Sequence, residues 1–246
     1  GEVRVIFTTD EEIGNGVDGL DVAKLGCDYG YTVDGGAIDE FECENFNAAE
    51  ASLTVHGIGV HPGSAKNVMV NAAALAMEFH AMLPADEVPE KTEGYEGFFH
   101  LHNMDGCVTE AHLRYIIRDH DRAKFEARKA LFLDCAAKLN AKYGPHTAEA
   151  SVTDSYYNMK EKVSSHPQLI DLARAAFAKH GVVMRCVPIR GGTDGARLSW
   201  DGLPCPNLPT GGYNYHGVRE WIPVKSLGLM ADVLVELVRS FADVRV

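Results

Sequence analysis

The chain of 246 residues lacks three features that would place it in common functional classes. It has 23 Lys and Arg against 35 Asp and Glu, and its net charge of -12 argues against nucleic acid as a main partner, because phosphate binding needs a basic surface. Its six cysteines form no C-x-x-C pair, so a thiolate zinc site or a redox motif is not indicated. It also lacks an apolar run of about 18 residues, so no membrane-spanning helix is predicted.

Scattered cysteines of this kind are typical of small core residues in a reducing compartment, so we expect a cytoplasmic protein. The chain opens with Gly1 rather than Met and almost at once enters an apolar stretch at residues 3–7. We expect that stretch to be a buried parallel strand. We also expect the chain to be the C-terminal portion of a longer protein, so that the absence of a targeting segment carries little information.

The pattern of apolar residues predicts two domains. Residues 1–47 and 154–246 have α/β character, and they end in an amphipathic helix with its apolar stripe at Leu227, Met230, Leu234, Leu237 and Phe241. Residues 48–153 predict the order β-α-β-β-α-β, the ferredoxin-like pattern. We therefore expect an α/β catalytic domain into which a smaller α+β domain is inserted.

Within the insertion, turn and cap signals predict the element bounds. Asp121 is a suitable N-cap for a helix that ends before Gly144. Residues 103–106, Asn-Met-Asp-Gly, are a turn signal between two strands. The predicted helices cover 67–83 and 121–143, and the predicted strands cover 49–58, 98–101, 107–117 and 147–152.

Four polar motifs follow strand-like runs, namely Glu11-Glu12, Asp34-Gly35-Gly36, Thr193-Asp194-Gly195 and His216-Gly217. Ligands of open α/β sheets bind outside the carboxyl ends of the strands, so we expect these side chains at one sheet edge. Adjacent acids repel unless a cation lies between them. Carboxylate and imidazole ligands suit zinc, manganese or cobalt, and the pattern predicts a metallohydrolase.

Each motif also has a simpler structural explanation. A Glu-Glu pair is typical of a helix N-terminus or a solvated turn, and Asp-Gly-Gly is typical of a turn. Thr193 or Asp194 suits a helix N-cap, and His216 alone suits an ordinary surface or core histidine. The coincidence of all four motifs at strand ends favours the metal site.

Longer stretches carry a resemblance to a known family. They are residues 9–14, 31–36, 60–72, 92–98, 115–119, 154–159, 188–196 and 206–217. Over essentially its whole length the chain resembles the tripeptide aminopeptidases of the di-zinc exopeptidase superfamily, which includes carboxypeptidase G and the aminoacylases. The resemblance implies a zinc-exopeptidase-like catalytic domain with an inserted lid domain, two zinc ions per complete subunit, a tripeptide substrate and a possible homodimer through the insertion.

The resemblance also implies catalytic and metal-binding roles. Glu11 would be the general base that acts on a zinc-activated water and passes the proton to the leaving amine. Glu12 and His216 would ligate one zinc ion, and Asp34 would ligate the other. His61, in the inserted domain, would stabilise the oxyanion.

Three more residues are implied in substrate binding. Arg118 and Arg190 would bind the terminal carboxylate of the peptide, which suits their planar guanidinium groups, and Asn103 is a further candidate. Simpler explanations exist here too, because His61-Pro62-Gly63 could be only a turn and Arg118 could form a surface ion pair with its acidic neighbours.

The chain departs from the family pattern in one respect. The family's His-x-Asp motif and a further acidic ligand lie upstream of the Glu-Glu motif, and these 246 residues contain neither. A catalytic zinc ion has about three protein ligands, whereas the remaining residues supply one or two per ion. We therefore expect the chain alone to bind zinc weakly and to hydrolyse little.

Two rival functions remain open. One is a related carboxypeptidase, dipeptidase or N-acyl amino acid deacylase, which would differ in the shape of its substrate pocket. The other is a non-catalytic fragment that dimerises through the inserted domain. The sequence also leaves open which metal is native and whether His61 acts within its own subunit or across a dimer.

Overall fold

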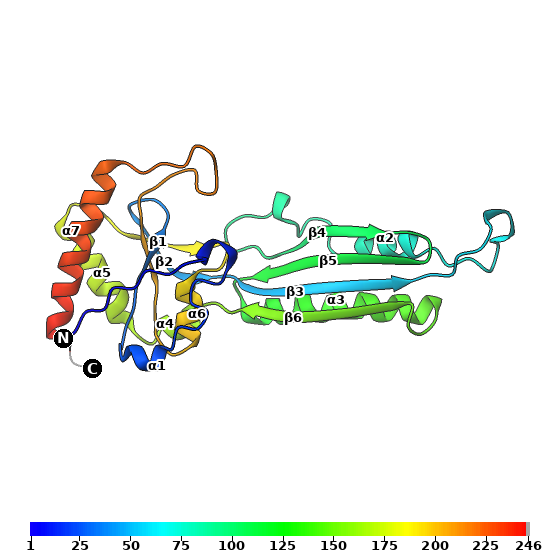
Figure 1. Ribbon diagram of the computed structural model, residues 1–246, viewed down its shortest axis with the longest axis horizontal. Helices are drawn as coiled ribbons and strands as arrows, with labels where there is room; N and C mark the ends of the chain where they lie inside the picture. The colour runs from blue at the N-terminus through cyan, green and yellow to red at the C-terminus, as the bar shows by residue number, and fades with distance from the viewer. Residues whose placement is uncertain (245–246) are drawn as a thin grey trace. The chain divides into compact units, whose positions relative to one another are not determined.

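The computed structural model describes residues 1–244, which form two compact units (Figure 1). One unit comprises Gly1–Asn45 together with the chain from Tyr157 onward, and the other comprises Phe46–Tyr156. The second unit is therefore one continuous segment, while the first is built from two segments. Among the described residues, no helix combines the length and apolarity that a bilayer crossing requires.

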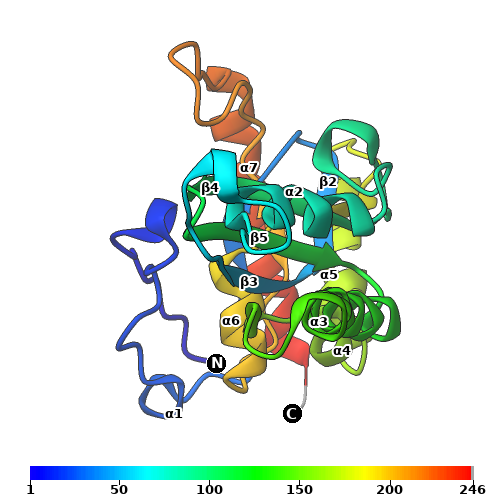
Figure 2. The ribbon, with the colours of Figure 1, turned by 90° about the vertical axis from the view of Figure 1, so that its right-hand side faces the viewer.

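The Phe46–Tyr156 unit is an antiparallel four-stranded sheet with two helices on one face (Figures 1 and 2). The sheet order is β4-β5-β3-β6. This arrangement confirms the predicted ferredoxin-like pattern. In chain order the elements are β3 (Asn47–His56), η2 (Pro62–Ser64), α2 (Ala72–Met82), η3 (Pro89–Lys91), β4 (Phe98–Gly106), β5 (Glu110–Asp119), α3 (Arg122–Tyr143) and β6 (Ala148–Tyr156).

Alternation along the strands decides which face the helices cover. In β3, Leu53 and Val55 are buried, while Glu50 and Ser52 on the opposite face are exposed. Asp121 caps α3 by accepting a hydrogen bond from the Lys124 backbone N–H at 2.8 Å, as predicted. The unit therefore has one apolar, helix-covered face and one polar face.

The predicted turn at residues 103–106 is wrong. These residues belong to β4, where Gly106 pairs in register with Ala111 of β5. The chain reverses after them, and the Cys107 N–H donates to the Glu110 carbonyl at 2.7 Å. Pairing with β5 supplies backbone hydrogen bonds that hold these residues in a strand. The turn-like local sequence does not reveal that pairing.

The other unit has a mixed four-stranded sheet of order β1-β8-β2-β7. Parallel pairing joins β1 to β8 and β2 to β7, and a single antiparallel contact joins β2 to β8. In chain order its elements are η1 (Glu11–Ile13), α1 (Val22–Leu25), β1 (Thr32–Gly35), β2 (Glu40–Asn45), α4 (Lys160–Val163), α5 (Pro167–Lys179), β7 (Arg185–Ile189), α6 (Asp194–Trp200), β8 (Asn207–Pro209), α7 (Val224–Ser240) and η4 (Phe241–Asp243).

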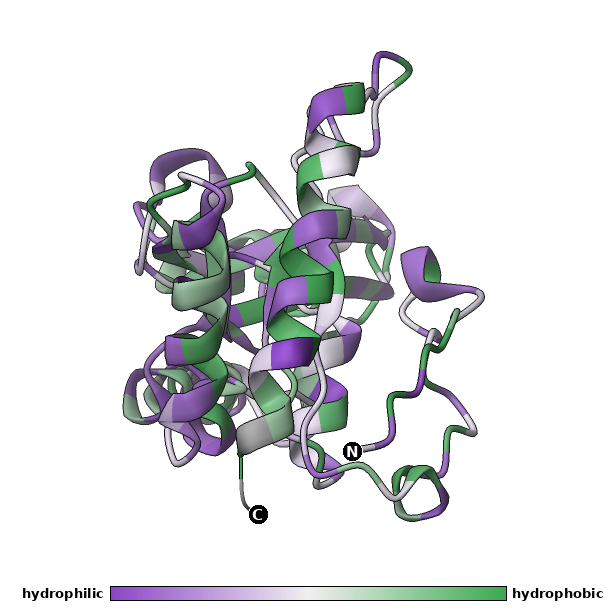
Figure 3. Cartoon of the chain, turned by 90° about the vertical axis from the view of Figure 1, so that its left-hand side faces the viewer, coloured by the Kyte–Doolittle hydropathy of each residue, from purple (hydrophilic) through white to green (hydrophobic). Residues whose placement is uncertain are grey.

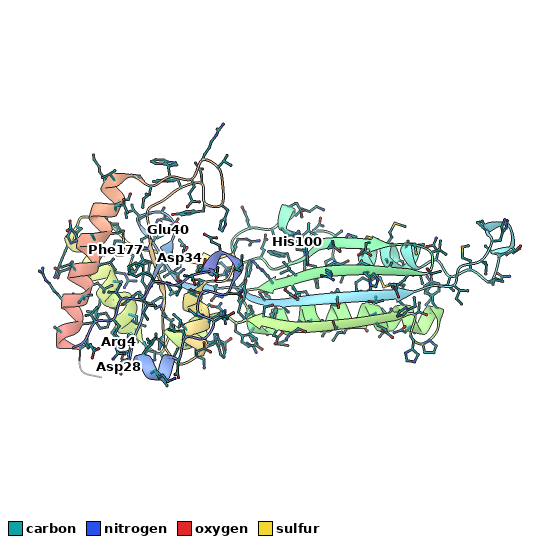
Figure 4. All side chains as sticks on the ribbon, in the orientation of Figure 1. Arg4, Asp28, Asp34, Glu40, His100 and Phe177 are labelled. Atoms are coloured by element: carbon teal, nitrogen blue, oxygen red, sulfur yellow. The ribbon has the colours of Figure 1, made fainter. Side chains whose placement is uncertain are left out.

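Helices α5 and α7 supply the main core of this unit. Phe177 of α5, labelled in Figure 4, packs in one cluster with Phe41 of β2 and Met230, Val233 and Leu237 of α7. The helix that leads to the C label in Figure 3 carries both hydrophobic and hydrophilic residues along its length. This matches the amphipathic C-terminal helix predicted from the sequence.

The predicted buried strand at residues 3–7 is not formed. These residues have no regular secondary structure, and Phe7 is 91% exposed. Figure 3 shows hydrophobic residues along the coil that leaves the N label. Within residues 1–244 no strand lies beside this segment to take up its backbone hydrogen bonds, and an apolar pattern alone does not make a strand.

A buried polar network crosses the sheet where β1, β2 and β8 meet. Asn207 is 2% exposed and donates from Nδ2 to Glu42 Oε2 at 3.2 Å, while its Oδ1 accepts from Thr193 Oγ1 at 3.0 Å. Burial raises the pKa of Glu42 to about 7, with a smaller contribution from Glu40, and the hydrogen bond from Asn207 opposes that rise.

The aromatic core of the Phe46–Tyr156 unit generates a stability prediction. The Phe132 ring is fully buried and lies 4.9 Å from the ring of Phe79 and 5.2 Å from that of Tyr115, centroid to centroid. We expect Phe132→Ala to lower the free energy of unfolding by about 3–5 kcal/mol, measured by urea denaturation, because it opens a cavity. The neighbouring Leu133 is 44% exposed, so Leu133→Ala is the control and should cost far less. Equal losses in the two variants would contradict this assignment of the core.

The raised pKa of Glu42 generates a prediction about pH. The folded state holds this proton up to about pH 7, whereas the unfolded chain releases it near pH 4.5. Between these values the folded state binds more protons, so its stability falls as pH rises. The loss of stability across this window is on the order of 3 kcal/mol. We expect Glu42→Gln to remove it, measured by urea denaturation at several pH values.

The control for that measurement is Glu2→Gln, since Glu2 lies in the same unit and its side chain is 75% exposed. Its stability profile should follow that of the unmodified chain. A Glu42→Gln profile that also follows the unmodified chain would show that Glu42 ionises normally in the folded state.

Candidate metal centre

Glu11 and Glu12 lie on the tight turn η1. The turn begins after Asp10, with φ of 61°, and ends at Gly14, with φ of 80°. The Gly14 N–H donates to the Glu11 carbonyl at 2.7 Å, and the Asn15 N–H donates to the Asp10 carbonyl at 3.0 Å. Glu11 is half-buried and Glu12 is exposed, so adjacent carboxylates are held in different environments.

Asp34 lies on β1 and is labelled in Figure 4. The strand pairs in parallel with β8, in the register Thr32 to Asn207 and Val33 to Leu208. Glycine is needed after Asp34, because a Cβ on Gly35 would lie 2.9 Å from the Leu208 carbonyl oxygen. Close pairing with β8 therefore fixes the strand end that carries this carboxylate.

His216 lies on the loop between β8 and α7. Tyr213 and Trp221 close the loop through a backbone bridge and a ring stack with centroids 4.8 Å apart. His216 Nδ1 lies 3.2 Å from Glu12 Oε2, and both side chains are more than three-quarters exposed. Residues that are far apart in the sequence thus meet in an open ion pair.

Asp194 is the first residue of α6 and is buried beside this group. Thr193 caps the helix by accepting from the Gly195 N–H at 3.4 Å, which confirms the N-cap interpretation of this motif. The Asp194 carboxylate packs against Gly16, where even an added Cβ would lie 2.2 Å from it. Asp194 therefore contributes a negative charge to this group of residues from a buried position.

Burial and neighbouring charges both act on the pKa values of the carboxylates in this group. Burial raises the pKa of Glu11, and the charges of Asp34, Asp194 and Glu12 raise it further, while His216 lowers it. Burial also raises the pKa of Asp34, with Glu12 and Asp194 adding to the rise and His216 opposing it. These mutual influences show that Glu11, Glu12, Asp34 and His216 lie within electrostatic range of one another.

The donor chemistry fits a divalent cation only in part. Carboxylate and imidazole donors suit zinc, and an excess of negative charge attracts a cation. Within the described part of the chain, however, no set of three His, Cys, Asp or Glu residues surrounds a common ion position. The residues present therefore fit an incomplete ligand set, with Glu12 and His216 in contact and Asp34 nearby.

Arg190 belongs to the same unit as these residues. It is half-buried and follows directly after β7, before Gly191 and Gly192. The other predicted substrate-binding residues and His61 belong to the Phe46–Tyr156 unit.

Within that unit, His61 is exposed and caps η2 by accepting from the Gly63 N–H at 3.1 Å, so it does form the simple turn considered from the sequence. Asn103 is exposed on β4 and pairs in register with Arg114. The Arg118 guanidinium lies over the Tyr156 ring, 5.9 Å from its centroid. The carboxylate of Asp119, the next residue, pairs instead with Arg128.

Two residues beside the group had no role assigned from the sequence. Thr210 and Tyr215 lie in the stretch that carries the resemblance and connect the His216 loop to β1 by hydrogen bonds. Both residues carry a hydroxyl group and precede His216, a candidate metal ligand, in the sequence. That proximity is the signal from which a role in orienting His216 could have been inferred.

Comparisons with known proteins agree with the fold. Residues 43–147 match the family described as Peptidase dimerisation domain. Aminopeptidase PepT from Bacillus cereus superposes with a TM-score of 0.83 at 24% identity, covering 96% of this chain and 63% of that one. A tripeptidase from Staphylococcus aureus gives 0.84 at 23% identity with the same coverage. At these identities the solved structures establish the zinc-exopeptidase-like fold.

Closer relatives come from the curated proteins. Peptidase T of Clostridium novyi is 52% identical over 242 residues, which are 98% of this chain and 60% of that protein. Peptidase T of Halothermothrix orenii is 52% identical over 242 residues, 98% of this chain and 59% of that protein. The chain thus spans about three fifths of the length of the relatives that it matches. With about half of its residues identical over nearly its whole length, the chain is similar to about three fifths of these peptidase T proteins.

Proposed function

We propose that this chain carries part of the active site of a metal-dependent aminopeptidase that releases the N-terminal residue from tripeptides. The convergence of Glu11, Glu12, Asp34 and His216, from three separate segments of one unit, is the observation that carries the proposal. The peptidase T relatives support the choice of substrate class.

Glu12 and His216 would hold one zinc ion and Asp34 the other, with two ions per complete subunit. When bound, zinc polarises a carbonyl group and lowers the pKa of water. Burial, followed by the charges of the neighbouring carboxylates, raises the pKa of the half-buried Glu11. A raised pKa brings a carboxylate closer to the range in which it can accept and return a proton at neutral pH. Glu11 would therefore be the general base.

The resemblance to the tripeptide aminopeptidases supplies the roles proposed for the remaining residues. Arg190 and Arg118, with Asn103, would bind the terminal carboxylate of the peptide through hydrogen bonds from cationic and amide groups. His61 would stabilise the developing oxyanion. The six cysteines are free in the structure, which suits a reducing, cytoplasmic location.

The match of residues 43–147 to a peptidase dimerisation domain favours a homodimer formed through the Phe46–Tyr156 unit. Strands β4 and β6 are the two edges of the sheet in this unit, and an edge is the place at which a further strand can pair. Dimerisation through this unit would be compatible with peptidase activity.

Two substitutions separate proton transfer from metal binding. We expect Glu11→Gln to abolish tripeptide hydrolysis and leave zinc content largely unchanged, because the amide cannot accept a proton. His216→Ala should lose zinc together with activity. Both are measured in the chain joined to the upstream segment of a peptidase T relative, by elemental analysis and by turnover of tripeptides. Loss of zinc in Glu11→Gln would assign Glu11 to ligation instead.

The same material tests the substrate class. Tripeptides should be cleaved faster than dipeptides or N-acyl amino acids, and a reversed preference would favour the related carboxypeptidase, dipeptidase or deacylase. The chain of 246 residues alone should turn over slowly, because Glu12, Asp34 and His216 give fewer than three ligands per ion. Full turnover by that chain would contradict the proposed ligand set.

A further inference from the structure

Tyr215, next to His216 in the sequence, connects the His216 loop to the end of β1. Its hydroxyl lies 2.7 Å from Thr210 Oγ1, and 3.4 Å and 3.5 Å from the carbonyl oxygens of Gly35 and Gly36. Thr210 Oγ1 donates to the Gly35 carbonyl at 3.0 Å. A short chain of hydrogen bonds therefore runs from the residue before His216 to the residue after Asp34.

The loop is shaped to receive the Tyr215 side chain. A Cβ on Gly212 would lie 2.8 Å from the tyrosine hydroxyl and 3.1 Å from two ring atoms, so the ring rests directly on the glycine. The Gly212 N–H donates to Thr210 Oγ1 at 3.2 Å, which directs that hydroxyl toward the tyrosine and the strand end. Both observations show that neighbouring residues hold the Tyr215 side chain in one position, although the residue is 42% exposed.

His216 itself needs support from its surroundings. Its backbone has φ of 60°, a conformation that costs free energy in a residue other than glycine. Its side chain is 77% exposed. A histidine ligand is effective when neighbouring groups fix its orientation, and loss of such support costs about 10–100-fold in metal affinity.

We propose that Tyr215 is a positioning residue. Through Thr210 and the Gly35 carbonyl it holds His216 at a fixed distance from Asp34, so that the two zinc positions are preorganised relative to each other. This inference rests on the proposed function, because it takes Asp34 and His216 as ligands of neighbouring ions. In this role Tyr215 contacts neither the metal ions nor the substrate.

The test compares Tyr215→Phe with Tyr213→Phe in the chain joined to the upstream segment of a peptidase T relative. The first variant loses the bridging hydroxyl and keeps the ring. In the second, the ring stack with Trp221 is kept and no described hydrogen bond is lost. Zinc affinity is measured by competition with a chromophoric chelator, and mobility of residues 212–220 by hydrogen exchange with mass spectrometry.

For Tyr215→Phe we expect zinc affinity about tenfold lower, faster exchange over residues 212–220 and an unchanged thermal unfolding midpoint. Tyr213→Phe should resemble the unmodified chain in all three. Thr210→Val should reproduce the Tyr215→Phe effect, and the double variant should be no worse than either single variant, since both remove the same bridge. Additive losses would mean that the two hydroxyls act separately and would overturn the inference.

His216→Ala distinguishes the two proposals. If it weakens zinc binding while Tyr215→Phe changes neither affinity nor exchange, the positioning role is refuted and the proposed function stands. If His216→Ala leaves zinc binding unchanged, the proposed ligand set is refuted. Hydrogen exchange then still decides whether Tyr215 holds the loop against β1, because that measurement needs no metal.

Discussion

Repulsion among carboxylates is the constraint on which the candidate site depends. Burial raises the pKa of Glu11 and of Asp34, the neighbouring carboxylates raise both further, and His216 opposes the rise. A protein gains nothing in stability from such an arrangement. The fold maintains it with a tight turn, a strand end and a closed loop, each held by its own backbone hydrogen bonds. A cation bound in this region would offset the repulsion among the carboxylates.

The site is built from short connections on a well-packed support. Phe177 of α5 and Met230 of α7 pack behind the sheet, and the Asn207 network joins β1, β2 and β8 beneath its end. Glu11 and Glu12 lie on a turn and His216 on a loop, whereas Asp34 lies at the end of β1 and Asp194 at the start of α6. Glycines allow close approach beside these groups, as at Gly16 and Gly35.

Sequence patterns predicted the elements whose hydrogen bonds are local. The cap at Asp121 and the order of strands and helices in the inserted unit agree with the structure, because propensity, caps and tertiary packing all favour the same outcome. Residues 3–7 and the turn at 103–106 were mispredicted, since strand formation depends on a partner that local sequence does not encode. Glu12 and His216 do meet, as expected, although the strand predicted before Glu12 is not formed and His216 lies on a loop rather than at a strand end. The hydroxyl bridge through Tyr215 depends on loop geometry that no periodicity reveals.

The Phe46–Tyr156 unit begins and ends on adjacent strands. Ala48, near the start of β3, pairs with Tyr156, the last residue of β6. The points at which the chain enters and leaves this unit are therefore adjacent. The segment between them can be excised or replaced without separating the two flanking parts of the chain. A segment of different length or sequence can therefore stand between the same two connections, while the turn, strand and loop that carry Glu11, Asp34 and His216 keep their own backbone hydrogen bonds.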